Sequence, residues 1–256
     1  MEDIDLLQGG EIQFMEFIND VRKKFIKIIN DNFLDEDEKI QIITARQLTP
    51  EEAIGNPDRN DFPLLKGKEF MIQASFKEAY GQAFTDMPGY FNGTLKEVLN
   101  LKLINNYERA IFIATLNAVM RYLKFADKTI HCRGHEPTKC ASQLVEYIKE
   151  NFKNPRIAFI GLQPAMVCSL ASEFQIRVTD LDPDNLGQYK CGVLVEDVKN
   201  TQDIIEWGDI ILATGTTSVN DTLYNLLRKK PVIFYGVTIS GISAIENYVR
   251  YCPFGH

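Results

Sequence analysis

Residues 156–183, RIAFIGLQPAMVCSLASEFQIRVTDLDP, decide the fold of this chain. Two short apolar runs, 156–160 and 176–179, flank a helical pattern over 165–173. A strand, a helix and a second strand joined by short turns form a right-handed unit in which the strands are parallel. This stretch therefore predicts a parallel sheet.

The same alternation continues to the end of the chain. The pattern predicts a helix over 137–152 before the first strand, a short strand near 192–195, a helix over 201–207, a strand over 209–213, a helix over 219–228, a strand over 231–235 and a last helix from about residue 242. Alternating strands and helices are typical of a parallel sheet that helices cover on both faces. We therefore expect a Rossmann-like unit in this part of the chain.

A different pattern precedes it. Helical spacing of apolar residues over 11–32 is followed by apolar runs at 39–44, 69–76 and 80–85, which we interpret as strands. Residues 107–120 are apolar nearly all round, as in a helix buried between other elements. The fold class is therefore α/β, with an α+β N-terminal domain over residues 1–95 and a Rossmann-like C-terminal domain over residues 96–256.

The composition excludes several classes of function. The 256 residues include 35 acidic and 28 basic side chains, a formal charge of −7, without the basic face that nucleic-acid binding needs. We see neither a signal peptide nor an apolar run long enough to span a membrane, and so expect a cytoplasmic protein. Five cysteines in a chain of this size predict reduced thiols, with Cys168 in the core.

Ligands of open parallel sheets bind beyond the carboxyl ends of the strands. Gly161, Gln163 and Pro164 follow the first strand, where a turn enters a helix whose N–H groups can face an anion. The segment lacks the G-x-G-x-x-G fingerprint, which disfavours NAD. Asp180 ends the second strand, where an acid often binds a ribose hydroxyl. The alternatives are a turn without a ligand and an aspartate that only caps the turn before Pro183.

A hydroxyl-rich loop follows the strand at 209–213 and opens the helix predicted over 219–228. Its candidate ligand-binding residues are Thr214, Gly215, Thr216, Thr217 and Asn220, and Gly236 follows the next strand. Backbone N–H groups and hydroxyls could bind a phosphate, a carboxylate or a metal-bound oxyanion there. Ser218 or Asn220 as a simple helix cap is the alternative. We expect these loops to form one pocket.

Cysteine and histidine cluster just before the helix at 137–152. His131, Cys132, His135 and Cys140 lie within ten residues of one another, and thiolate and imidazole are ligands of transition metals. Zinc, cobalt, nickel and iron are not distinguished by this pattern, whose spacing matches no standard zinc module. Cys252 and His256 could complete a site if the fold returns the tail to this loop. Buried cysteines acting as small apolar residues are the alternative.

Together these segments carry a family resemblance. GLQPA at 161–165, DLDP at 180–183, ATGTTSVNDT at 213–222 and YGVT at 235–238, preceded by ATLNA at 114–118, resemble the family described as putative heavy-metal chelation, from about residue 107 onward. The resemblance implies an N-terminal domain like that of enolase, a Rossmann-like domain, and metal chelation with a link to anaerobic cobalamin synthesis.

Three hypotheses of function follow, and the sequence identifies no reaction. The first is a protein that binds a metal ion, a metal chelate or a small anionic metabolite in a cleft between the two domains. The second is a transferase or lyase whose nucleotide-like cofactor, such as S-adenosylmethionine, lies against Asp180. The third is an assembly protein whose helix at 107–120 and C-terminal segment build a homodimer.

Overall fold

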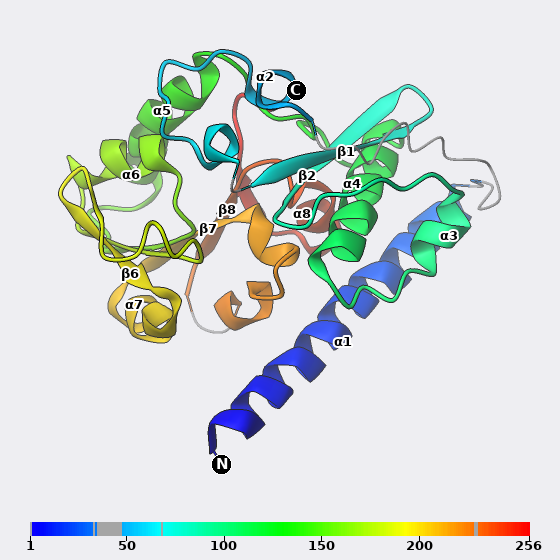
Figure 1. Ribbon diagram of the computed structural model, residues 1–256, viewed down its shortest axis with the longest axis horizontal. Helices are drawn as coiled ribbons and strands as arrows, with labels where there is room; N and C mark the ends of the chain where they lie inside the picture. The colour runs from blue at the N-terminus through cyan, green and yellow to red at the C-terminus, as the bar shows by residue number, and fades with distance from the viewer. Residues whose placement is uncertain (1, 33, 35–47, 68, 228–229) are drawn as a thin grey trace.

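A computed structural model describes residues 2–32, 34, 48–67, 69–227 and 230–256. Its centre is a seven-stranded sheet of order β5-β6-β4-β3-β7-β8-β9, in which β5 is antiparallel to β6 and the other neighbouring strands are parallel (Figure 1). The strands are β3 (Ile157–Ile160), β4 (Ile176–Asp180), β5 (Tyr189–Lys190), β6 (Val193–Asp197), β7 (Ile210–Thr214), β8 (Val232–Tyr235) and β9 (Val249–Tyr251). The α/β fold class is confirmed.

Both faces of this sheet are covered. On β3, Ile157 and Phe159 pack into the core beneath α5 (Glu136–Asn151) and α6 (Pro164–Ala171). Ala158 and Ile160 pack into the opposite core. That second core also holds residues of α7 (Thr201–Trp207) and α8 (Ser240–Glu246). Because successive side chains of a strand point to opposite faces, a continuous apolar run is what a doubly covered strand requires.

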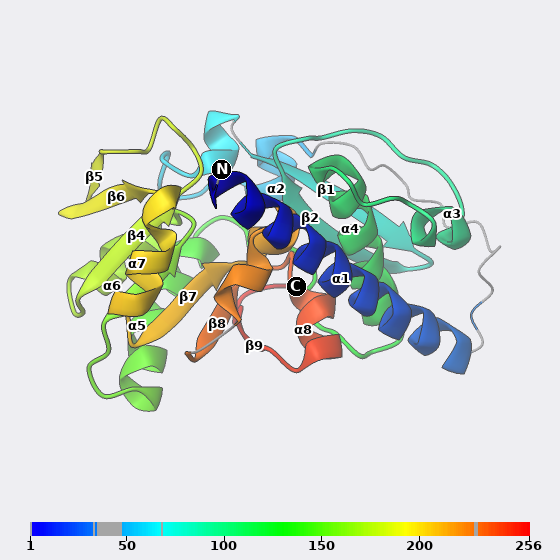
Figure 2. The same cartoon turned by 90° about the horizontal axis from the view of Figure 1, so that it is seen from below.

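A two-stranded antiparallel hairpin lies beside the sheet. Strand β1 (Phe70–Phe76) pairs with β2 (Ala79–Thr85), and α4 (Asn106–Tyr122) packs across them. A Cβ atom on Gly81 would lie 2.3 Å from the backbone nitrogen of Ala118, so glycine permits this approach. The remaining elements of this part are α1 (Glu2–Asp31), α2 (Pro50–Ile54), the 3₁₀ turn η1 (Pro63–Lys66) and α3 (Leu95–Leu99). Figure 2 shows α1 lying across the side that holds α4 and the hairpin.

Helix α4 joins the hairpin to the sheet. Its buried Asn117 donates from Nδ2 to the carbonyls of Gln82 and Thr238, at 2.9 and 3.0 Å, and its Oδ1 accepts from the Gly241 N–H at 2.7 Å. Residues from Arg109 to Met120 are all buried within the chain, and a homodimer built on this helix stays a prediction. One apolar core includes residues of α1, the hairpin, α4 and α8. The domain division at residue 95 stays a prediction.

Most of the expected elements form within a few residues of their predicted bounds, although α1 begins well before residue 11. The helix predicted over 219–228 is wrong. The 3₁₀ turn η3 (Gly215–Ser218) ends before this range, and the 3₁₀ turn η4 (Leu223–Leu226) forms within its described residues, 219–227. Thr217 and Ser218 donate their hydroxyls to the carbonyls of Thr214 and Gly215, both at 2.7 Å, and such local bonds compete with an α-helix. Asp221, at φ 70°, also leaves the helical region.

Other expectations meet different outcomes. The short strands β5 and β9 were not expected, and the strand expected at 39–44 lies outside the described residues. The prediction that all five cysteines are reduced and that Cys168 lies in the core is also wrong. Cys168 is only partly buried and forms a disulfide with Cys191, with 5.2 Å between their Cα atoms. Pairing depends on distance in space, which spacing along the chain does not give.

Among the described residues, no helix is both long and apolar enough to cross a membrane.

Candidate functional site

The strand order places a topological switch point between β3 and β7. From β3 the chain moves to one side through β4 and β6, then returns to the other side of β3 as β7. Loops diverge at such a point and leave a crevice at the carboxyl ends of the strands. Gly161 follows β3 at φ 86°, and a Cβ atom on it would lie 2.6 Å from Cγ2 of Thr214 at the end of β7. Only glycine fits this turn without displacing Thr214.

Two adjoining hollows lie at this edge of the sheet. We call the smaller one, of about 120 Å³, the thiol cavity, because His131, Cys132, Cys140 and Cys252 line it. We call the larger one, of about 700 Å³, the acidic groove, because Glu69, Asp86, Asp180 and Asp182 line it. The two share lining residues: Pro63, Glu69, Gly161, Asp180, Thr214 and Thr216. We call the two together the cleft.

The thiols of the cavity are held in their neutral form. Burial raises the pKa of Cys140 to about 12 and that of Cys132 further, and the thiols lie close enough to raise each other's pKa by charge repulsion. Burial likewise raises the pKa of Cys252. Neutral thiols in a mostly apolar wall can bind a soft metal ion only by releasing their protons.

His131 completes the wall of the thiol cavity. Its ring packs edge-on against Phe84, with 5.4 Å between the ring centres. Burial lowers the pKa of His131 to about 4, so that the ring is neutral at pH 7. The Nδ1 atom is buried and has no hydrogen-bond partner. In the tautomer protonated at Nε2, Nδ1 carries the free lone pair that a metal ion needs.

The predicted metal ligands do not all come together. His131, Cys132 and Cys140 line the thiol cavity, whereas His135 is exposed and its Nδ1 lies 2.6 Å from Oδ1 of Asp58 on the surface. The fold does return the tail to this loop: Cys252 follows β9 into the cavity wall. Across the residues that the structure describes, no three histidine, cysteine or acidic side chains are grouped closely enough to hold a metal ion.

The acidic groove concentrates negative charge around Glu69. Burial, together with the charges of Asp180, Asp182 and Asp86, raises the pKa of this carboxyl group to about 7. Glu69 and Asp86 come from the hairpin side, far from Asp180 in sequence. Reasoning from the sequence missed both, because a strand-flanking Glu69 and a turn Asp86 carry no local signal. These four acidic side chains outnumber Lys199, which also lines the groove, so the lining favours a cationic ligand.

Asp180 accepts three hydrogen bonds from its own chain. Its Oδ2 accepts from the Leu162 N–H at 2.7 Å, and its Oδ1 accepts from the Asp182 N–H and from Nδ2 of Asn185, both at 2.9 Å. These bonds hold the turn after β3 against the end of β4. These hydrogen bonds give the carboxylate a structural function, and binding of a ribose hydroxyl by Asp180 stays a prediction.

The hydroxyl-rich loop is similarly engaged. Oγ1 of Thr214 donates to Oγ1 of Thr216 at 3.1 Å and accepts from the Thr216 N–H at 3.3 Å. The α-helix N-terminus expected here is not formed, because a 3₁₀ turn begins at Gly215 instead. Gln163 caps α6 by accepting from the Met166 N–H at 2.5 Å, which leaves less of that helix end for a ligand.

Most of the ten predicted ligand-binding residues line the cleft. They are Gly161, Gln163, Asp180, Thr214, Thr216, Thr217, Asn220 and Gly236. Pro164 is instead buried in the first turn of α6, and Gly215 is buried where a Cβ atom would lie 2.8 Å from the backbone nitrogen of Ile239. Tyr235 closes the far side, where its hydroxyl donates to the Gly161 carbonyl at 2.9 Å. Ligand binding by these residues stays a prediction.

A family model matches the part of the chain that forms most of the seven-stranded sheet. Residues 143–247 match the family model described as putative heavy-metal chelation. The match confirms the resemblance drawn from the sequence, over a shorter segment than residues 107–256. It covers β3 to β8 and the loops of the switch point, but none of the thiol and imidazole side chains of the cavity. No curated protein matches the sequence significantly.

Solved structures are similar to larger parts of the chain. A protein with unknown function of this family from Pyrococcus horikoshii is 20% identical, over 67% of this chain and 68% of its own, with a TM-score of 0.45. Another, from Desulfitobacterium hafniense, is 14% identical over 72% and 74%, with a TM-score of 0.47. Glutamyl-tRNA reductase from Methanopyrus kandleri is 14% identical over 62% of this chain and 42% of its own, with a TM-score of 0.31.

Proposed function

We propose that this protein binds a transition-metal cation, free or carried by a small organic chelator, in the cleft at the carboxyl ends of β3, β4 and β7. One observation carries the proposal. His131, Cys132, Cys140 and Cys252 meet in one cavity wall, directly beside a groove lined by four carboxyl groups. The matched family description, putative heavy-metal chelation, supports the same class of ligand.

The two walls would contribute differently to binding. The carboxylates of the acidic groove attract positive charge and disfavour the anionic metabolite that the sequence left open. The neutral His131 Nδ1 and the thiols are soft donors, suited to zinc, cobalt or nickel. Because the described side chains present no preformed group of three donors, either the cavity wall rearranges around a bare ion or the chelator supplies the remaining ligands.

Proton release gives this proposal a specific signature. The thiol pKa values lie far above 7, so each thiol that coordinates the metal loses a proton on binding. We expect the apparent affinity for cobalt to rise with pH, and cobalt–thiolate charge-transfer absorption to appear on binding. In hexaamminecobalt(III), ammonia fills every coordination position of the metal, so this cation cannot bond to sulfur. Its binding would therefore measure the attraction of the acidic groove for positive charge alone.

The test titrates protein with Co²⁺, Ni²⁺ and Zn²⁺ by calorimetry and absorption. The wild type should bind with charge-transfer absorption, and Cys132→Ala/Cys140→Ala should remove most of that absorption, because it leaves only Cys252 among the cavity thiols. Cys168→Ser/Cys191→Ser is the matched control, because it also removes two sulfur atoms, but outside the cavity. Absence of binding by the wild type to all three ions and to hexaamminecobalt(III) would exclude the proposal, as would equal loss in the control.

A further inference from the structure

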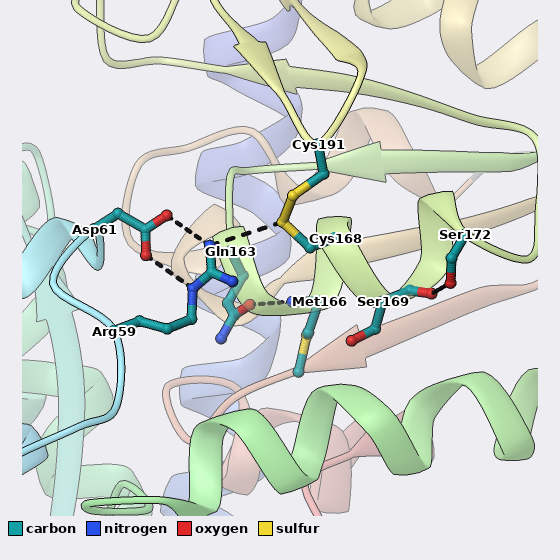
Figure 3. Close-up of a disulfide and its surroundings, with 8 residues drawn as sticks. All are labelled: Arg59, Asp61, Gln163, Met166, Cys168, Ser169, Ser172 and Cys191. Atoms are coloured by element: carbon teal, nitrogen blue, oxygen red, sulfur yellow. Dashed lines mark hydrogen bonds and ion pairs between the residues drawn. A yellow bond between two sulfur atoms is a disulfide. The ribbon is translucent and has the colours of Figure 1, made fainter.

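The disulfide links α6 to the turn between β5 and β6. Cys168 lies on α6, and Cys191 lies with Gly192 in the two-residue turn between β5 and β6, 23 residues further along the chain (Figure 3). The bridged segment includes β4 and the turn that carries Asp180 and Asp182 in the acidic groove. The bond therefore constrains one wall of the cleft from outside it.

The two sulfur atoms have unequal surroundings. Cys191 is exposed, at φ 51° in a turn where Asn or Gly is the usual residue. Cys168 is only partly exposed, and Nη2 of Arg59 lies 3.7 Å from its Sγ. Figure 3 shows the Arg59 side chain reaching from its loop toward the disulfide. An incoming thiol therefore meets Cys191 first, whereas Cys168 has the cation beside it.

Arg59 is held in place for this contact. Its Nε and Nη2 atoms donate to Oδ1 and Oδ2 of Asp61, at 2.9 and 2.7 Å. This pairing lowers the pKa of Asp61, to which the charge of Lys190, the neighbour of Cys191, also contributes. The groups of this region that carry charge are therefore Arg59, Asp61 and Lys190. A guanidinium close to sulfur favours the thiolate over the thiol.

We propose that the Cys168–Cys191 disulfide is a thiol-exchange site at which Arg59 positions and stabilises the departing Cys168 thiolate. A dithiol is the co-reactant. One of its thiolates attacks Sγ of Cys191, a new S–S bond forms between them, and the Cys191–Cys168 bond breaks with its electron pair remaining on Cys168. The second thiolate of the dithiol then displaces Cys191. The dithiol is oxidised by two electrons, the protein is reduced by two, and the cysteines take up protons from water.

Attack at Cys191 follows from leaving-group chemistry as well as from access. A thiol of lower pKa leaves faster, and Arg59 gives Cys168 that property. Reduction releases the β5–β6 turn from its covalent link to α6, and the pairing of β5 with β6 and of β6 with β4 then holds it. The covalent constraint on the acidic turn is then lost. The proposal is independent of what the cleft binds.

The first experiment treats native protein with dithiothreitol at pH 7, alkylates it at intervals and maps each cysteine by mass spectrometry. Cys168 and Cys191 should become alkylated together while the circular dichroism spectrum is unchanged and Cys132, Cys140 and Cys252 stay protected. The proposal is overturned if oxidised protein carries no Cys168–Cys191 link, or if the link is reduced only when the protein unfolds.

The second experiment isolates the effect of Arg59. In Cys191→Ser protein, the pH midpoint of Cys168 alkylation should lie below the ordinary value of about 8.5 for a free cysteine. Arg59→Gln should raise that midpoint, and Arg59→Lys should restore part of the shift. In protein with both cysteines, Arg59→Gln should slow reduction about fivefold.

Arg156→Gln is the matched control, since Arg156 forms a similar two-bond pair with Asp209 away from the disulfide. A purely structural role of Arg59 would alter the circular dichroism spectrum without moving the alkylation midpoint. An unmoved midpoint in folded Arg59→Gln protein therefore refutes the assignment.

Discussion

The thiol cavity and the acidic groove adjoin, yet burial acts on them in opposite ways. In the cavity, burial raises the pKa of Cys140 from 9 to about 12 and lowers that of His131 from 6.5 to about 4, so both groups are neutral at pH 7. In the groove, burial and neighbouring acids raise the pKa of Glu69 from 4.5 to about 7, so this group titrates at neutral pH. Burial disfavours the charged form of every group. Whether a buried group is then neutral at pH 7 or titrates near pH 7 depends on the pKa that the same group has in water.

The largest effect should come from the anchor of the acidic groove. Asp180→Ala removes an acceptor of three hydrogen bonds, two of them from backbone N–H groups, and should lower the free energy of unfolding by about 3 kcal/mol. Urea denaturation measures the change. Asp182→Ala, a neighbouring acid of the same turn, is the control and should cost less. Equal losses of stability in the two variants would contradict the assignment of Asp180 as the anchor of this turn.

Glu69 should make stability fall as pH rises. Its folded pKa of about 7 exceeds the unfolded value of 4.5, so the folded state binds more protons between these values and loses stability as pH rises through them. Glu69→Gln should remove a loss of about 2 kcal/mol between pH 5 and 7.5. Denaturant midpoints across this range measure it. Glu78→Gln, an exposed acid on the same hairpin, should leave the profile unchanged.

His131 should produce the opposite slope. Its folded pKa of about 4 lies below the unfolded 6.5, so the unfolded state binds more protons between these values and stability falls as pH decreases through them. The wild-type profile should therefore be shallow between pH 4.5 and 6.5, where the two slopes oppose each other. His131→Gln should reveal the descending slope of Glu69, by about 2 kcal/mol. The exposed His135→Gln is the control, and a profile identical in both variants would contradict this assignment.

The smallest effect should come from a thiol. Cys140→Ala removes one buried sulfur atom that is uncharged on both sides of pH 7, and we expect a cost of about 1 kcal/mol from lost packing. This cost should be the same at pH 5 and pH 8, as thermal or urea unfolding can show. A cost that grows with pH would mean that the thiol ionises and that the contrast between the two walls is weaker than proposed.

Much of the sheet domain could be predicted from local patterns. The apolar runs at 156–160, 209–213 and 231–235 form neighbouring parallel strands, because a doubly covered strand must be apolar on both faces. The glycine turn after β3 could also be predicted, because a short turn between a strand and a helix needs backbone angles that few residues other than glycine adopt. The hydroxyl-rich loop misled because the same Thr and Ser residues suit a helix N-terminus and a 3₁₀ turn.

Only part of the lining of the cleft could be predicted from the sequence. The loops at the ends of parallel strands share one edge of the sheet, so Gly161, Asp180 and Thr214 could be grouped by a general rule. Glu69, Asp86 and Phe84 reach the same edge through the packing of α4 and the hairpin, in which Asn117 bonds to both parts. No local pattern encodes that packing.

The sequence by itself determined most of the strands and helices and which strand ends face one edge, because hydrophobic periodicity and turn chemistry act over a few residues. Tertiary structure alone decided that Cys252 returns to Cys132 and Cys140, that Cys168 pairs with Cys191, and that Glu69 faces the acids of the sheet. These outcomes depend on distances between residues far apart in the chain. They also decide which groups are charged, since a pKa is set by burial and by neighbours in space.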